Sequence, residues 1–119
     1  MMARLRCVFY DPEAVDEGSR LSGRALEACA RAGVRVFALA DDGAVEDEGE
    51  QRSIEFVMRA HALAPEECIG VGAALAEAPV GVVWVGPLDL EVRGEQVEVA
   101  EDGDELLYNA VIAELARRR

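Results

Sequence analysis

The sequence predicts an α/β fold in which a parallel sheet lies between two layers of helices. Four short segments are apolar almost throughout, at residues 6–10, 34–39, 68–71 and 82–85. Stretches with helical spacing of apolar residues separate most of them. Strands that are buried on both faces form continuous apolar runs, and their alternation with helices is typical of a parallel sheet covered on both sides. The length of 119 residues suits one domain, residues 1–119.

The first strand is expected over residues 6–10 (RCVFY), and it ends at Asp11. A helix should follow from Ser22 to Ala32, because serine is a favourable N-cap residue and the next residue, Gly33, is a favourable C-cap residue. Residues 34–39 (VRVFAL) then predict a second strand that again leads to acidic residues.

A second helix is predicted over residues 53–63, since Ile54, Val57 and Met58 share one helical face and Pro65 follows. The next strand should span residues 68–71 (CIGV). An alanine-rich helical turn at 73–78 and a strand at 82–85 (VVWV), with Trp84 in the core, complete this part.

The last third of the chain predicts a hairpin and a helix. Apolar and polar residues alternate from Leu88 to Val99, and residues 93–96 (RGEQ) have turn composition. A helix should run from Asp104 to about Ala116, with Leu107, Val111 and Leu115 facing inward. Acids at its start and arginines at its end suit the helix dipole.

The composition limits the partners and the chemistry. With 12 basic and 24 acidic residues the net charge is −12, which argues against nucleic acid and anionic membranes as partners. The chain contains no lysine and no threonine, and its serines are Ser19, Ser22 and Ser53. No apolar run reaches the roughly 20 residues of a membrane span, and residues 1–10 do not have the pattern of a signal peptide. A cytoplasmic location is therefore expected.

Several single residues are expected to be structural. Cys7, Cys29 and Cys68 lie far apart in apolar surroundings, which predicts three buried, reduced thiols. The one histidine, His61, falls at the edge of an apolar helix face without a nucleophile motif, so a half-buried structural role is expected. Gly70 and Gly72 do not form a dinucleotide fingerprint.

Ligands of doubly wound α/β sheets bind beyond the carboxyl ends of the strands. In a Rossmann-like sheet of this kind the positions to consider are therefore Asp11, Asp41, Gly72 and 86–87. Asp11 has two interpretations: a reactive or metal-binding carboxylate, or an acid that caps the turn at Pro12.

The order of these segments resembles the haloacid-dehalogenase-like (HAD) superfamily, in particular its Cof-type phosphatase branch. Residues 62–72 (ALAPEECIGVG) are similar to the segment that leads into the fourth HAD motif, and residues 7–11 (CVFYD) to the first strand with its nucleophile. Residues 33–39 and 81–87 resemble two further core strands. The resemblance implies a three-layer core without the cap domain, whose place is taken by the acidic segment 41–50.

The HAD family transfers phosphoryl groups through an aspartyl phosphate, with a second acid two residues after the nucleophile, a hydroxyl, a lysine and Mg²⁺. The resemblance assigns the nucleophile to Asp11 and the acid/base role to Glu13. It places the hydroxyl position near Ala40 and the lysine position at Glu50, with Arg52 the nearest base.

In the fourth motif, the metal-binding Asp corresponds to Ala73 and the Asn to Ala76, whereas Glu77 retains a carboxylate. Asp11, Glu13 and Glu77 are therefore the candidate Mg²⁺ ligands, and otherwise no cofactor is expected. Phosphoryl transfer depends on positioning and on neutralised charge, so these replacements predict a pseudo-phosphatase. The alternative is a weak, capless, Mg²⁺-dependent phosphohydrolase that uses Asp11 and Glu13.

The expected role of a pseudo-phosphatase is binding or assembly. The outer edge of the 88–99 hairpin could join a second copy by strand addition and form a homodimer. The segment 41–50, in which six of ten residues are acidic, is expected as a solvated loop, with docking to a basic protein partner as the alternative. A two-component receiver domain also has this length and layout, but the third strand does not end in the acid that a receiver requires.

Overall fold

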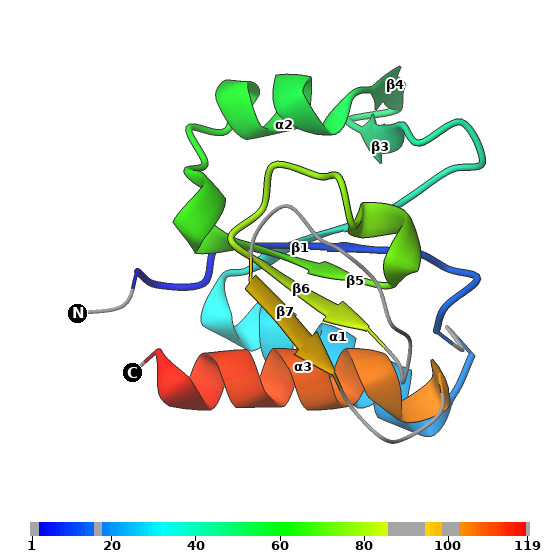
Figure 1. The fold of residues 1–119 in the computed structure, drawn as a ribbon, viewed down its shortest axis with the longest axis vertical. Coiled ribbons are helices and arrows are strands. Elements are labelled where there is room, and N and C mark those ends of the chain that lie inside the picture. The colour runs from blue at the N-terminus through cyan, green and yellow to red at the C-terminus, as the bar shows by residue number, and fades with distance from the viewer. Residues whose placement is uncertain (1–2, 16–17, 86–94, 99–102, 119) are drawn as a thin grey trace.

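The computed structural model of the chain describes residues 3–15, 18–85, 95–98 and 103–118. Its helices and strands follow the predicted order closely (Figure 1). They are β1 (Cys7–Tyr10), α1 (Arg20–Ala32), β2 (Arg35–Ala38), β3 (Val45–Asp47), β4 (Glu50–Arg52), α2 (Ile54–Ala60), β5 (Cys68–Val71), β6 (Val82–Val85), β7 (Glu95–Glu98) and α3 (Gly103–Arg117). Two 3₁₀ turns, Pro65–Glu67 and Ala73–Leu75, flank β5.

The central sheet has five strands in the order β2-β1-β5-β6-β7, and each pair of neighbours is parallel. The predicted α/β class with a parallel sheet is therefore confirmed. Because β1 lies between β2 and β5, the chain moves outward from β1 in both directions, and the strand order reverses at this point. Such a reversal is where doubly wound sheets form their ligand crevices.

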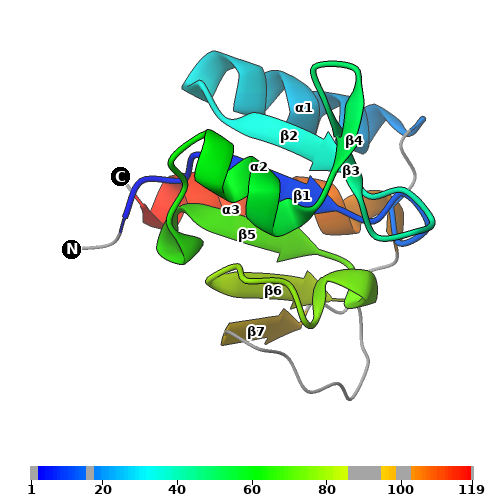
Figure 2. The ribbon, with the colours of Figure 1, turned by 90° about the horizontal axis from the view of Figure 1, so that it is seen from above.

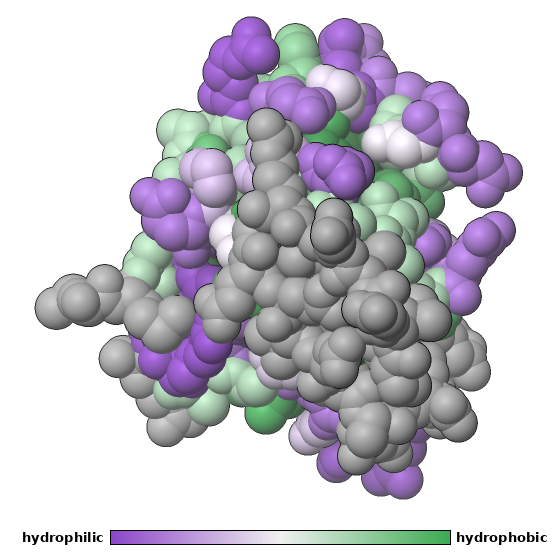
Figure 3. All heavy atoms as spheres, viewed as in Figure 1, coloured by the Kyte–Doolittle hydropathy of each residue, from purple (hydrophilic) through white to green (hydrophobic). Residues whose placement is uncertain are grey.

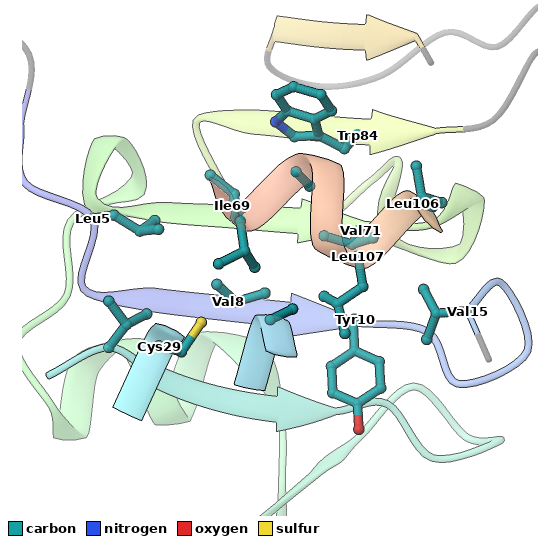
Figure 4. Packing of buried hydrophobic residues seen from close by; sticks show 14 of the residues in the cluster. Leu5, Val8, Tyr10, Val15, Cys29, Ile69, Val71, Trp84, Leu106 and Leu107 are labelled. Carbon is teal, nitrogen blue, oxygen red and sulfur yellow. The ribbon is translucent and has the colours of Figure 1, made fainter. Parts of the chain in front are cut away.

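Helices cover both faces of the sheet, as the view from above shows (Figure 2). Successive strand residues point to opposite faces, so Val8 and Tyr10 join the cluster under α1 and α3, whereas Cys7 and Phe9 join the cluster under α2. Figure 4 shows Val8, Ile69 and Trp84 from three different strands in the α1–α3 cluster. Trp84 is 7% exposed, which confirms its predicted place in the core.

Helix α1 begins earlier than predicted. Its N-cap is Ser19, which has an extended backbone and whose hydroxyl oxygen accepts the Ser22 N–H at 3.0 Å. Ser22 lies within the helix and is fully buried, with its hydroxyl 3.1 Å from that of Ser19. Both serines are suitable N-cap residues, and only the packing of the first turn selects between them. Gly33 ends the helix at φ 72°, as the sequence predicts.

Residues 45–52, which include the second half of the acidic segment 41–50, form a β-hairpin where a loop was expected, and most residues of the segment are exposed as predicted. β3 and β4 pair antiparallel around Glu48 and Gly49, which both have positive φ angles. Two such residues form the tight turn that fits the twist of a hairpin. Val45 is fully buried in the α2-side cluster and anchors the hairpin to the sheet. The prediction of a loop was wrong because the charge of the segment concealed its buried apolar anchor, Val45.

The region predicted as a hairpin over 88–99 also differs. Its first arm lies outside the described residues. Glu95 and Gln96, expected in the turn, are strand residues of β7, which runs parallel to β6. Alternation of apolar residues indicates a strand but carries no information about the direction of its neighbour. No helix in the described parts of the chain is both long and apolar enough to cross a membrane.

Candidate functional site

The site lies where β1 and β5 end side by side. The Asp11 N–H donates to the Val71 carbonyl at 3.0 Å and so extends the pairing of these strands by one residue. Gly72 follows with φ 114°, and a Cβ atom at this position would lie 2.9 Å from the Cβ atoms of both Asp11 and Ala14. Glycine is therefore required here both by the backbone and by the close approach of the two chain segments.

Asp11 is the first residue of a tight turn. Its Oδ1 accepts the Glu13 N–H at 3.0 Å, and its backbone carbonyl accepts the Ala14 N–H at 3.0 Å. An aspartate that binds the backbone two residues onward stabilises a turn of this kind. The geometry thus gives Asp11 the capping role that the sequence left open, and one of its carboxylate oxygens is already used.

A pocket of about 240 Å³ opens beside this turn. Its charged lining residues are Asp11, Glu13 and Asp41. The remaining lining residues are Pro12, Leu39, Ala40, Gly43 and Ala74. Among these described lining residues there is no arginine, lysine or hydroxyl side chain, so the pocket offers three negative charges and no side chain that would attract an anion.

The structure brings two of the three predicted metal ligands to one pocket. Asp11 and Glu13 line the same pocket, but Glu77, an exposed residue after the Ala73–Leu75 turn, does not. Within the described ranges, no three His, Cys, Asp or Glu side chains gather as a metal-holding group. Metal binding by Asp11, Glu13 and Glu77 therefore stays a prediction, and we derive no metal-dependent step from these residues.

The positions that the resemblance assigned to phosphate binding do not all line this pocket. Ala40 lines the pocket and offers only a methyl group. Glu50 lies on β4, where it forms an ion pair with Arg52. The Arg52 guanidinium carbon also lies 4.7 Å from the centre of the Phe56 ring, a cation–π arrangement. Arg52, the nearest base by sequence, is thus held at the hairpin and helix α2.

A second polar cluster connects the acidic hairpin to α2. His61 Nε2 lies 2.9 Å from Asp47 Oδ2, and both side chains are largely buried. The imidazole also packs against Phe37 of β2, with ring centres 6.1 Å apart. The predicted partial burial of His61 is confirmed. Its partner Asp47 was not foreseen, since fourteen residues separate the two in sequence.

A buried carboxylate in α3 was missed entirely. Glu114 is fully buried, and its Oε2 accepts the Trp84 indole N–H at 3.2 Å. Its Oε1 accepts from Arg117 Nε at 2.6 Å and from Arg118 Nε at 3.1 Å. Arg118 also donates to the carbonyls of Ala3 and Glu66. The sequence does contain a signal for this burial. Glu114 follows Leu107 and Val111 at helical spacing and therefore lies on the same inward face of α3.

The three cysteines are free and buried, as predicted. Cys7 and Cys68 stand opposite each other on β1 and β5. A hydrogen bond with Cys68, together with burial, raises the pKa of the Cys7 thiol far above its ordinary value. Burial raises the pKa of Cys29 to about 11. Thiols of this kind are inert components of the core.

Comparison of this chain with protein-family models, with curated protein sequences and with solved structures gives no match.

Proposed function

We propose that this chain is a catalytically degenerate, capless HAD-like core that acts as a binding or assembly module and not as a phosphatase. The observation that carries the proposal is the lining of the pocket at the ends of β1 and β5. Three carboxylates, those of Asp11, Glu13 and Asp41, line this pocket. A phosphatase of this family would bind the phosphate dianion of its substrate in the same place. A phosphoryl group needs donors and positive charge at that place.

The electrostatic argument can be given a magnitude. Two like unit charges about 4 Å apart repel by about 4 kcal/mol at the effective dielectric of a protein surface. A dianion beside Asp11, Glu13 and Asp41 would meet several such repulsions, reduced by the solvent that enters the open pocket. Removing one preorganised donor typically costs about 100-fold to 1000-fold in rate, and no lining side chain among the described residues replaces those donors.

Support for the HAD-like ancestry comes from position alone. Asp11 follows the first strand, and Gly72 follows the strand beside it, so the two motifs that carry the resemblance meet at the point where the strand order reverses. Glu13, two residues after Asp11, lines the same pocket. The spatial arrangement of the positions therefore agrees with the proposed ancestry, although the side chains at most of them have changed.

The test is a screen of phosphomonoesters with Mg²⁺, in which the chain is compared with Asp11→Asn. We expect no turnover that depends on Asp11. Turnover that Asp11→Asn abolishes would overturn the proposal and establish the alternative, a weak Mg²⁺-dependent phosphohydrolase with Asp11 as nucleophile and Glu13 as acid. Labelling by acetyl phosphate would instead indicate a receiver-like activity and would equally refute the proposal.

For an assembly module the partner is the central question. A homodimer through the outer edge of β7, within the predicted 88–99 region, would give twice the monomer mass in light scattering coupled to size exclusion. A basic protein partner at residues 41–50 would meet the exposed carboxylates of the β3–β4 hairpin. In Figure 3 hydrophilic side chains cover the molecule around α2 and this hairpin, as suits a polar docking surface.

A further inference from the structure

The strand β2 forms one edge of the central sheet, since β1 is its single neighbour there. The N–H groups of Arg35 and Leu39 donate to the carbonyls of Arg6 and Tyr10, at 2.9 and 2.8 Å, on the β1 side. Successive N–H groups of a strand point in opposite directions within the sheet plane. Those of Val36 and Ala38 therefore point outward, to the side where the described residues form no further strand of this sheet.

The β3–β4 hairpin covers only the carboxyl end of this edge. Leu39 and Val45 form an isolated antiparallel bridge, and the Ala40 N–H donates to the Ala44 carbonyl at 2.8 Å. In the view from above, the hairpin crosses at the end of β2 and leaves the rest of the strand beside α1 (Figure 2). An open strand edge of this kind is a template for pairing with another extended segment.

A groove of about 450 Å³ runs along this edge. Its floor is formed by Val36, Phe37 and Ala38, and Leu26 of α1 contributes apolar surface to one wall. The opposite wall belongs to the hairpin, from which Glu46, Glu48 and Gln51 contribute. The groove thus combines outward backbone groups, small apolar side chains and a polar rim, the features used in recognition by strand addition.

The charge of the rim selects the occupant. Glu46 and Glu48 are exposed and are the charged side chains among the described residues that line the groove. No basic side chain in that lining neutralises them. A second copy of this chain would bring a further net charge of −12 to an acidic rim. An extended segment with arginine or lysine at alternate positions complements both the rim and the strand edge.

We propose that the groove at the β2 edge binds an extended, basic peptide segment of a partner protein as an additional strand. This inference rests on the binding role proposed above. The segment pairs with the outward backbone groups of Val36 and Ala38. Its basic side chains lie against Glu46 and Glu48, and its alternate small apolar side chains face Leu26. The inference assigns both the site and the chemistry of the partner.

The experiment uses two blocked hexapeptides, one alternating arginine with valine and one alternating glutamate with valine, titrated into the isotopically labelled chain. The basic peptide should bind, and the amide protons of Val36 and Ala38 should become protected from exchange. The double variant Glu46→Gln/Glu48→Gln should weaken binding about threefold to tenfold, the effect of two exposed charge pairs. The matched control, Glu55→Gln/Glu66→Gln, changes the net charge equally on exposed residues elsewhere and should leave the affinity unchanged.

A second variant tests the backbone pairing. Val36→Pro removes one outward N–H that β1 does not use, and proline is tolerated at strand edges. It should abolish peptide protection at Ala38, and its fold is checked by circular dichroism. If the variant does not fold, amide protection in the unmodified chain decides the question.

Three results of the peptide titration would overturn the inference: equal binding of both peptides, no binding at millimolar peptide, or protection at β7 instead of β2. None of them bears on phosphoryl transfer, which the phosphomonoester screen tests separately. Self-association of the chain through β2, seen as concentration-dependent protection of Val36 without peptide, would also refute a basic partner.

Discussion

The buried carboxylate of Glu114 makes a strong prediction about stability. Glu114 is fully buried: Trp84 donates to one carboxylate oxygen, and Arg117 and Arg118 donate to the other. Of the arginines, the Arg118 side chain is 3% exposed, whereas that of Arg117 is 34% exposed. The substitution Glu114→Gln keeps the shape of the side chain and removes its charge.

The expected cost follows from these exposures. Removing one partner of a buried ion pair leaves the other charge without compensation and typically costs about 3–5 kcal/mol. Arg118 retains two carbonyl acceptors, those of Ala3 and Glu66, so we expect the lower limit, about 3 kcal/mol. Arg117→Gln is the matched control, because a partly exposed pair contributes about 1 kcal/mol or less.

Urea unfolding monitored by Trp84 fluorescence and by circular dichroism measures the difference. With a slope of about 2 kcal/mol per molar urea, Glu114→Gln should lower the midpoint by about 1.5 M. Arg117→Gln should lower it by about 0.5 M or less. If the two substitutions cost the same, the Glu114 carboxylate does not hold a buried charge network, and the reasoning from burial is wrong.

Three further predictions concern the site and the core. Gly72→Ala should destabilise the chain by about 2 kcal/mol or more in urea unfolding, because its Cβ would meet that of Asp11 at 2.9 Å at a φ of 114°; an unchanged midpoint would contradict this geometry. The backbone N–H of Ala64 lowers the pKa of Glu67, so this carboxylate stabilises the fold above its ordinary pKa, and the contribution is lost as the pH falls through the lowered value. Glu67→Gln should therefore reduce the acid-side dependence of the unfolding free energy on pH, and an identical pH profile would refute it. Burial raises the pKa of Cys29 to about 11, so alkylation by iodoacetamide at pH 8 should be undetectable by mass until urea unfolds the chain, and rapid labelling of the folded chain would contradict it.

Much of the fold could be predicted from the sequence because buried parallel strands have a distinctive composition. The segments at 68–71 and 82–85 are apolar in every side chain, and β5 and β6 have those boundaries. The C-cap at Gly33 was also predicted correctly, since it depends on local backbone chemistry. Residues 61–63, by contrast, extend beyond α2, which ends at Ala60.

The candidate site was predicted in part. The positions of Asp11 and Gly72 at adjacent strand ends follow from the parallel order, and Glu13 lies with Asp11 as its spacing suggests. Glu77 follows the Ala73–Leu75 turn and does not line this pocket, so its role as a third ligand stays a prediction. An alanine-rich sequence does not specify where such a turn stops, so the sequence alone could not place Glu77.

The sequence by itself determined the α/β class, the main strands, the buried cysteines and the absence of lysine and threonine chemistry. Each of these depends on local composition or on periodicity along the chain. Only the tertiary structure decided that part of the acidic segment is a hairpin, that Asp47 meets His61, that Glu114 is buried beneath Trp84, and that β2 keeps an open edge. These depend on which distant segments pack together, and an isolated charge in the sequence does not show whether its partner is water or a buried side chain.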